Sequence, residues 1–309
     1  MNTFFLAVNS VLPLFLVILT GIFMIRIKVA TVSWIDVLNK YVLWIGFPAL
    51  IFSALSKIDF KLGEYTGLIL ANSLYLVTCV LLAFPVSIIF RTTLKTKRTL
   101  FLLLAFGNVS YLGIPVLLNV YGNGILPSAV MISAANLFWM FTLALILIEI
   151  TGHEKVHYHL LFKKLVTNPL LIAVITGIAV SYLEIKMDSS LMKTIDLFGQ
   201  SVTAIVLFSL GIFLGSQQIG SKKEWLPVLF LSIAIMVVIP GIYFLILRST
   251  HLTHIQLQAS VMDAAMPMGL TSYALAEQYN LNAVLASRSV VLSTILSVII
   301  LPAWMVILA

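Results

Sequence analysis

The chain has 309 residues, of which 61% are hydrophobic and only 9% are charged, and its mean hydropathy is +1.13. Soluble domains are roughly 45–50% apolar and about 25% charged, and disordered chains are less hydrophobic still. The composition therefore excludes both classes and indicates an integral membrane protein. The net charge of +7 lies in short segments between apolar runs, which favours a role in membrane topology over binding to nucleic acid. Cys79 is the single cysteine of the chain, which excludes an intrachain disulfide and a cysteine metal cluster.

Ten apolar runs follow one another along the chain, and each is long enough to cross a bilayer as a helix. We expect helices because lipid cannot satisfy the edge of a strand, and a membrane barrel would show shorter, alternating segments. The first run is expected to remain as a helix, since Met1–Ser10 carries no basic residue of the kind that opens a signal peptide. The runs are residues 4–25, 35–55, 64–90, 99–121, 127–150, 166–183, 191–215, 225–247, 255–278 and 283–308.

Lys and Arg are divided unevenly between the two sides of this topology. Eleven lie in the links that follow odd-numbered runs, and five lie in the links that follow even-numbered runs. Basic loops are retained in the cytoplasm. We therefore predict a multi-pass protein of the plasma (inner) membrane with both chain ends on the extracytoplasmic side.

The second half of the sequence resembles the first. The segment Pro13–Ile22 (PLFLVILTGI) is identical at five of ten positions to Pro169–Ile178 (PLLIAVITGI), at an offset of 156 residues. Shorter matches in the same order are Leu50–Ser53 with Val206–Ser209, and Pro115 with Pro267. Repeats of five helices each would have opposite orientations in the membrane, as in many secondary transporters. We predict an all-α membrane protein of ten transmembrane helices in two inverted five-helix repeats, residues 1–150 and 165–309, joined by a cytoplasmic loop, 151–164.

Two of the runs carry a proline, a glycine and a polar side chain near their middle. The fourth run reads FGNVSYLGIP from Phe106 to Pro115, and the ninth reads VMDAAMPMG from Val261 to Gly269. Proline removes a hydrogen-bond donor and glycine relaxes the backbone, so we expect each helix to break at Pro115 and Pro267; the alternative is a simple kink. A break at the membrane centre exposes N–H groups that favour an anion, and it persists only beside a cavity or within protein.

These motifs resemble the auxin efflux carrier family, which includes plant PIN carriers and bacterial malate-permease-like members. The family pattern Pro-Asn-xxxx-Gly-Ile-Pro with a following Tyr-Gly, and the later pattern Ala-Ala-Leu-Pro-x-Gly with a following Glu-Tyr-Asn, both have counterparts here. The counterparts are Gly107-Asn108, Gly113-Ile-Pro115, Tyr121-Gly122, Ala264–Gly269 and Glu277–Asn280, with further likeness at Gly46–Phe52 and Asn168-Pro169. The resemblance covers nearly the whole chain, although the long cytoplasmic loop of the plant carriers is absent. It implies a ten-helix fold in which broken helices 4 and 9 cross, as in bile-acid/sodium symporters.

The resemblance places the family's substrate contact on Asn108. A neutral amide can bind a carboxylate without the cost of burying a full charge, and the alternative for Asn108 is a hydrogen bond between helices. Asn136 in the fifth run can face the same site. The candidate substrate-binding residues are Asn108, Tyr111, Gly113, Pro115, Asn136, Met266, Pro267, Met268 and Gly269.

Asp263 departs from the small or neutral residue that the family has at this place. A carboxylate near the middle of a span is costly and is functional by default, so we expect Asp263 to bind Na⁺, to carry a proton or to pair with a cation. Arg288 begins its own run, which leaves an axial offset of roughly 15 Å from Asp263 and disfavours that pair. We therefore favour a coupling role, with H⁺ or Na⁺ as the ion and no other cofactor or metal.

The other polar residues have simpler interpretations. Lys40, Glu277 and Arg288 lie near span ends, where long side chains reach the interface, and Glu277 and Arg288 flank one tight turn and can pair. His153, His157 and His159 resemble a metal cluster, but they lie in the basic loop and are expected to be solvated there. The same interpretation holds for His251 and His254.

Nucleotide-binding and hydrolytic motifs are absent from the sequence, which argues against a primary pump and against an enzyme. We predict a secondary carrier of a small organic anion, a carboxylate, that works by alternating access around the crossing of helices 4 and 9. Two alternatives stay open: a Na⁺-coupled organic-anion symporter of the bile-acid type, and an intramembrane receptor or enzyme without transport. The expected partners are the anion and the lipid bilayer, and a homodimer is kept open.

Overall fold

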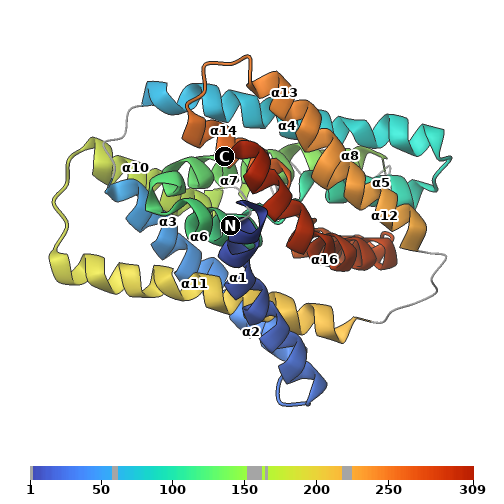
Figure 1. The fold of residues 1–309 in the computed structure, drawn as a ribbon, viewed down its shortest axis with the longest axis horizontal. Coiled ribbons are helices and arrows are strands. Elements are labelled where there is room, and N and C mark those ends of the chain that lie inside the picture. The colour runs from blue at the N-terminus through green and yellow to red at the C-terminus, as the bar shows by residue number, and fades with distance from the viewer. Residues whose placement is uncertain (1–2, 58–61, 152–161, 164–165, 218–224) are drawn as a thin grey trace.

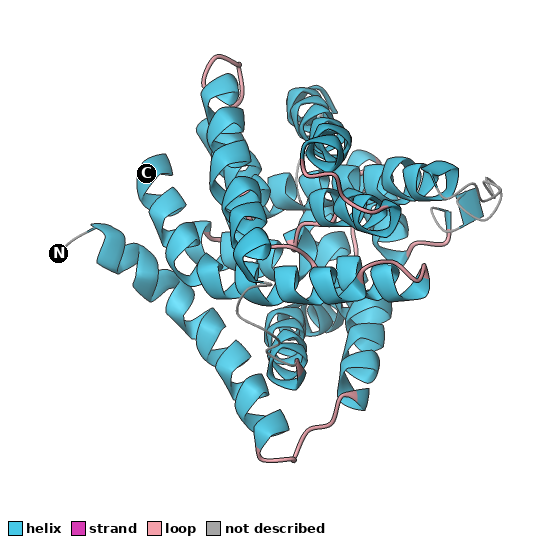
Figure 2. Ribbon diagram, turned by 90° about the vertical axis from the view of Figure 1, so that its right-hand side faces the viewer, coloured by secondary structure: helices cyan, strands magenta, loops and turns pink. Residues whose placement is uncertain are grey.

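The protein folds into helices joined by short links in the computed structural model, as Figures 1 and 2 show. The structure describes residues 1–309 except 1–2, 58–61, 152–161, 164–165 and 218–224. Most of the expected loop 151–164, with His153, His157 and His159, lies outside the described residues. The two ends of the chain lie on the same side of the molecule (Figure 2).

Helices occupy the apolar runs along the chain. In the first half they are α1 (Thr3–Arg26), α2 (Ser33–Tyr41), η1 (Val42–Gly46), α3 (Phe47–Ser56), α4 (Leu62–Ile89), α5 (Leu94–Ala105), η2 (Val109–Gly113), α6 (Ile114–Tyr121), η3 (Asn123–Ile125), α7 (Leu126–Trp139), η4 (Met140–Ala144) and α8 (Leu145–Thr151). In the second half they are α10 (Pro169–Tyr182), α11 (Ser189–Ser216), α12 (Trp225–Ile233), η6 (Ala234–Val238), α13 (Ile239–Leu247), α14 (His254–Ala264), α15 (Leu270–Gln278) and α16 (Ala283–Leu308).

The protein is therefore an all-α membrane protein. Within the described residues, seven continuous helical stretches are long and apolar enough to cross a bilayer, and two further apolar helices, Val109–Tyr121 and Pro169–Tyr182, are shorter. Several long stretches are not uniform α-helices, because single π-helical turns (η1, η2, η4 and η6) interrupt them. A π-helical turn shifts the hydrogen-bond register and allows a proline or a local bend within a helix.

Side chains fix where several helices begin. Asn168 accepts hydrogen bonds from the backbone N–H groups of Leu170 and Leu171, at 2.9 and 3.4 Å, and Pro169 occupies the first position of α10. At the start of α14, Thr253 and Gln256 form a reciprocal capping box. These caps satisfy N–H donors that a helix start leaves without acceptors, so they fix the residues at which α10 and α14 begin.

The helices fall into two groups that pack mostly among themselves. The first group, which we call the α1–α11 group, contains α1, α2, α3, α10 and α11, and α2 and α11 form the lower edge of Figure 1. The second group contains α4, α5, α7, α8 and α12 to α16. Helix α1 also contacts α16 and α6, so one seam between the two groups runs along α1.

Glycines bring α1 and α11 into backbone contact. A Cβ atom added at Gly21 would meet the carbonyl oxygen of Phe208, and one added at Gly211 would meet the carbonyl oxygen of Ile18. Small residues allow membrane helices to approach closely, because lipid gives them no hydrophobic drive to associate. The two helices are therefore held by close van der Waals packing along their crossing.

Candidate substrate site at the meeting of two broken helices

The first broken helix consists of α5, η2 and α6, and it is interrupted at Phe106–Asn108. The prediction that Pro115 marks this interruption is wrong: Pro115 is buried within the first turn of α6. Proline is tolerated there because the first N–H groups of a helix lack partners, and the π-helical turn η2 precedes it. The interruption contains Gly107, which stands where the family pattern has its first proline.

The second broken helix consists of α14 and α15, and its interruption, Ala265–Gly269, contains Pro267 as expected. Apart from proline, every N–H group of this segment has an acceptor. Those of Ala265 and Met266 donate to Val261 and Asp263 carbonyl oxygens at 3.0 and 3.1 Å. The Met268 N–H donates to Ser293 Oγ at 3.0 Å, and the Gly269 N–H donates to the carbonyl oxygen of Phe106 at 2.6 Å.

The two interruptions meet side by side through one antiparallel bridge. Gly107 lies opposite Met268, and the Asn108 N–H donates to the Pro267 carbonyl oxygen at 2.6 Å. The Gly269 N–H donates back to Phe106, as described above. A Cβ atom at Gly269 would lie 2.9 Å from the Phe106 oxygen and 3.0 Å from the Gly107 oxygen, so only glycine fits this close approach. Gly107 rather than Pro115 faces the Pro267 segment. Pro115 and Pro267, which correspond in the sequence comparison of the two halves, therefore do not occupy equivalent places.

Three buried polar side chains surround this meeting point. Asn136 on α7 donates its amide N–H to Asp263 Oδ2 at 3.0 Å. Asn108, Asn136 and Asp263 are 3%, 4% and 5% exposed. Asn108 Nδ2, Asn136 Oδ1 and Asp263 Oδ1 are buried, and no residue that the structure describes forms a hydrogen bond with them. A buried polar atom normally has a partner, so these three atoms are available to a ligand.

Asp263 does not pair with Arg288, which had been one of its possible roles. Its partner is Asn136, whereas the Arg288 guanidinium lies 6.0 Å from the ring centre of Trp225. The described residues do hold carboxylate–cation pairs, for example Lys57 with Asp196 at 2.8 Å, but Asp263 belongs to none of them. Among the described residues, the side chain that holds this buried acid is thus a neutral amide.

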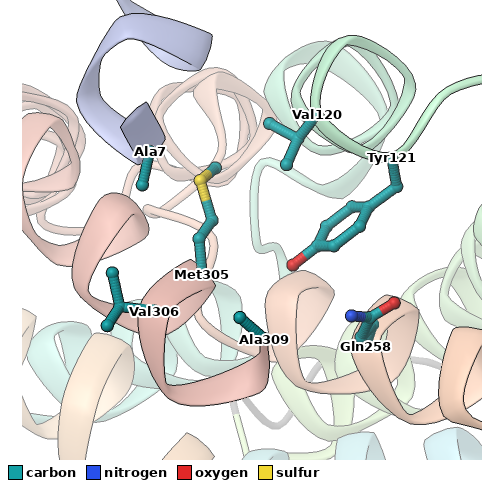
Figure 3. Close-up of a pocket in the computed structure, with 7 residues that line it drawn as sticks. All are labelled: Ala7, Val120, Tyr121, Gln258, Met305, Val306 and Ala309. Atoms are coloured by element: carbon teal, nitrogen blue, oxygen red, sulfur yellow. The ribbon is translucent and has the colours of Figure 1, made fainter. Parts of the chain in front are cut away.

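A small cavity adjoins Asp263. Its volume is about 30 Å³, and its walls include Tyr75, Gly107, Asn136, Asp263 and Met266. This space is enough for about one water molecule. A larger cavity of about 200 Å³ lies beyond the far end of α6, where the Tyr121 hydroxyl points toward the space beside Gln258 and Ala309 (Figure 3). The walls of the larger cavity contain none of the predicted site residues, so we assign the candidate site to the polar meeting point.

The remaining predicted residues lie around this point in different roles. The Tyr111 ring packs edge-on against Phe47, with 5.5 Å between ring centres, which joins η2 to the α1–α11 group. A Cβ atom at Gly113 would lie 3.8 Å from Asp263 Oδ1, so the absence of a side chain there leaves this oxygen accessible. Sequence reasoning missed Tyr75, which donates to the Ala264 carbonyl oxygen at 3.3 Å, and Ser293.

An all-α membrane protein whose two broken helices meet at a buried polar site has the architecture of a membrane transporter. The chain belongs to the family described as membrane transport protein, which matches residues 6–305 and includes auxin efflux carriers and malonate transporters. This family membership confirms the resemblance found in the motifs, and it points away from an enzyme.

Individual relatives are distant. The chain is 22% identical to a protein of Rhizobium meliloti named "Putative malonate transporter", over 93% of this chain and 91% of that protein. It is 21% identical to an uncharacterized transporter of Methanocaldococcus jannaschii, over 96% and 97% of the two chains. It is also 27% identical to auxin efflux carrier component 8 of Arabidopsis thaliana, over 44% of this chain and 38% of the plant protein.

Proposed function

We propose that the protein is a secondary carrier of a small organic anion and that it binds a carboxylate group at Asn108. The observation that carries this proposal is the amide nitrogen of Asn108, which is buried and unpartnered at the start of η2. The first N–H groups of a helix have no acceptors within that helix, and the helix dipole adds partial positive charge there. The amide and the helix start together favour an anion without any buried cation.

The substrate class that fits this site is a small mono- or dicarboxylate. The name of the Rhizobium meliloti relative makes malonate the first candidate to test. Apart from Tyr75, Asn136 and Asp263, the small cavity has apolar walls, for instance Leu103, Val109 and Met266, which suits the short carbon chain of such an acid. Binding requires more space than the present 30 Å³, so the site opens to one side of the membrane to receive substrate.

Asp263 is the group that we propose for coupling. Its Oδ1 atom has no partner, and a carboxylate at this depth repels an anion unless a cation neutralises it. A proton or a Na⁺ ion bound at Asp263 removes that repulsion, and substrate and cation then move together. The Na⁺-coupled alternative differs from the proton-coupled one only in which ion Asp263 binds.

The decisive experiment is uptake into proteoliposomes that contain the purified protein. Radiolabelled malonate, other short dicarboxylates and indole-3-acetate are supplied with a pH gradient, a Na⁺ gradient or neither. We expect saturable uptake of at least one carboxylate that an inward proton or Na⁺ gradient increases. A protein that binds these acids without moving them would be a receptor, and the carrier proposal would then be wrong.

The topology is a second part of the proposal. We propose ten spans in two inverted repeats, residues 1–150 and 165–309, in the plasma (inner) membrane with both ends extracytoplasmic. The excess of Lys and Arg after odd-numbered runs supports this orientation, and so does the position of both chain ends on one side of the fold. Single cysteines at Ala309 and Thr92, introduced after replacement of Cys79, should react with an impermeant reagent from opposite sides of the membrane. Labelling of both from one side would contradict the topology.

A further inference from the structure

Ser293 lies in the middle of α16, the helix that follows the second broken helix, and its side chain contacts the interruption of that broken helix. Its hydroxyl oxygen accepts the hydrogen bond from the Met268 N–H at 3.0 Å. Within Ala265–Gly269, the Met268 N–H donates to a side chain, whereas the other N–H groups donate to backbone carbonyl oxygens. The residue is fully buried, as is Met268, so this N–H group is shielded from bulk water.

The hydroxyl is itself held in one orientation. Ser293 Oγ donates to the Ser289 carbonyl oxygen at 2.6 Å, with the Val290 carbonyl oxygen at 3.2 Å. A serine hydroxyl has one hydrogen, so the bond to its own helix leaves only lone pairs for Met268. Helix α16 is continuous from Ala283 to Leu308, and it therefore supplies a rigid reference for the extended segment.

Met268 connects Ser293 to the candidate site through backbone hydrogen bonds. It lies opposite Gly107, and on either side of this pair the two segments exchange hydrogen bonds of 2.6 Å. One of these bonds comes from the backbone N–H of Asn108, whose side chain is the proposed substrate contact. A shift of Met268 therefore displaces the backbone of Asn108, which directly precedes η2.

We propose that Ser293 is a positioning residue of the substrate site, which holds the extended segment of the second broken helix so that Asn108 stays in place to bind the anion. This inference rests on the proposed function, because it assigns the consequence of the contact to substrate affinity. Ser293 does not touch the substrate. Its effect passes through the Met268 N–H and the paired segments.

Ser297 provides a matched control on the same helix. It is one turn further along, is equally buried, and its hydroxyl donates to the Thr294 carbonyl oxygen at 2.6 Å. This hydrogen bond stays within α16. Ser293→Ala and Ser297→Ala therefore remove the same group from the same environment, and only the first leaves the Met268 N–H without an acceptor. Ser293→Cys is a second test variant, because sulfur keeps most of the volume but accepts hydrogen bonds weakly.

The first measurement does not depend on transport. Hydrogen–deuterium exchange followed by mass spectrometry reports the protection of amides in peptides that cover 265–270. We expect exchange at Met268 to become about tenfold faster in Ser293→Ala, faster in Ser293→Cys, and unchanged in Ser297→Ala. Unchanged exchange in both Ser293 variants would overturn the proposal.

The second measurement separates affinity from rate in proteoliposomes, with malonate as the probe. We expect the apparent KM of Ser293→Ala to rise about tenfold while the maximal rate per folded protein stays within about twofold. Faster exchange without a change in KM would mean that Ser293 only stabilises the fold, and it would overturn the positioning role. If the unmodified protein transports none of the tested anions, the proposed function fails, whereas the exchange measurement still decides whether Ser293 holds Met268.

Discussion

The two broken helices differ in how their interruptions satisfy the backbone. In the second broken helix, each available N–H group from Ala265 to Gly269 has an acceptor within the protein. In the first, the start of η2 has no side-chain cap, and Asn108 Nδ2 next to it is unpartnered. An interrupted helix thus serves two purposes in this protein. The interruption that follows Asp263 has its backbone donors satisfied within the protein, and the interruption at Asn108 leaves one buried amide donor free for a ligand.

Among the tests of this difference between the two broken helices, a substitution at Asp263 should have the largest effect. In Asp263→Asn, the neutral amide resembles the protonated acid, so substrate should still bind and exchange across the membrane. Net uptake should lose its response to the coupling gradient, because the site can no longer gain or release a cation. Uptake and counterflow of labelled malonate, with and without pH and Na⁺ gradients, measure this.

The gradient that loses its effect identifies the ion at Asp263. Loss of the pH response alone indicates a proton, and loss of the Na⁺ response alone indicates Na⁺. A variant that keeps the normal dependence on both gradients would show that Asp263 supports the structure only.

Gly269→Ala should produce the next largest effect, because it separates the two interruptions. The added Cβ would stand within 3.0 Å of the Phe106 and Gly107 carbonyl oxygens, which belong to the backbone and cannot rotate away. We expect loss of most transport and a lower melting temperature in detergent. The matched control is Gly241→Ala on α13, whose Cβ would meet an ordinary contact of 3.9 Å with the Trp304 ring. Equal behaviour of the two variants would argue against the close pairing of the segments.

Asn108→Ala should have a smaller effect, confined to the ligand. It removes a hydrogen bond to a charged group, which is worth roughly 1.5–3 kcal/mol, or about 10–150-fold in affinity. Melting temperature should change little, since the Asn108 amide nitrogen has no partner in the protein. Equilibrium binding of malonate by calorimetry measures the loss. Asn119→Ala, further along α6, removes an amide that donates to the Ser10 carbonyl oxygen and should leave affinity unchanged.

Local patterns in the sequence account for part of this site. The interruption at Pro267 follows from the proline and glycine within one apolar run, and the family resemblance is confirmed. The interruption of the first broken helix is different. Pro115 is the stronger breaker by residue type, yet the chain opens at Gly107 and accommodates Pro115 after a π-helical turn. Propensity indicates that a helix is disturbed, but tertiary pairing decides where.

Contacts between distant helices could not be predicted in the same way. Asn136 and Asp263 are 127 residues apart, and Ser293 is one of several buried serines on α16. A serine in an apolar run usually bonds its own helix, as Ser297 does, so nothing in the sequence separates Ser293 from its neighbours. Asp263 was conspicuous because a membrane-interior acid is rare, whereas Ser293 and Tyr75 became visible only through their contacts.

The glycine contact between α1 and α11 has a mechanical consequence. Where two backbones touch, no layer of flexible side chains lies between them that could slide or repack, so we expect these helices to behave as a single lever. Movement between the two groups of helices must then take place elsewhere, along seams such as that between α1 and α16. A larger side chain at Gly21, as in Gly21→Leu, would not weaken the contact between α1 and α11 gradually. It would have to force the Phe208 carbonyl aside and tilt α1 as a whole.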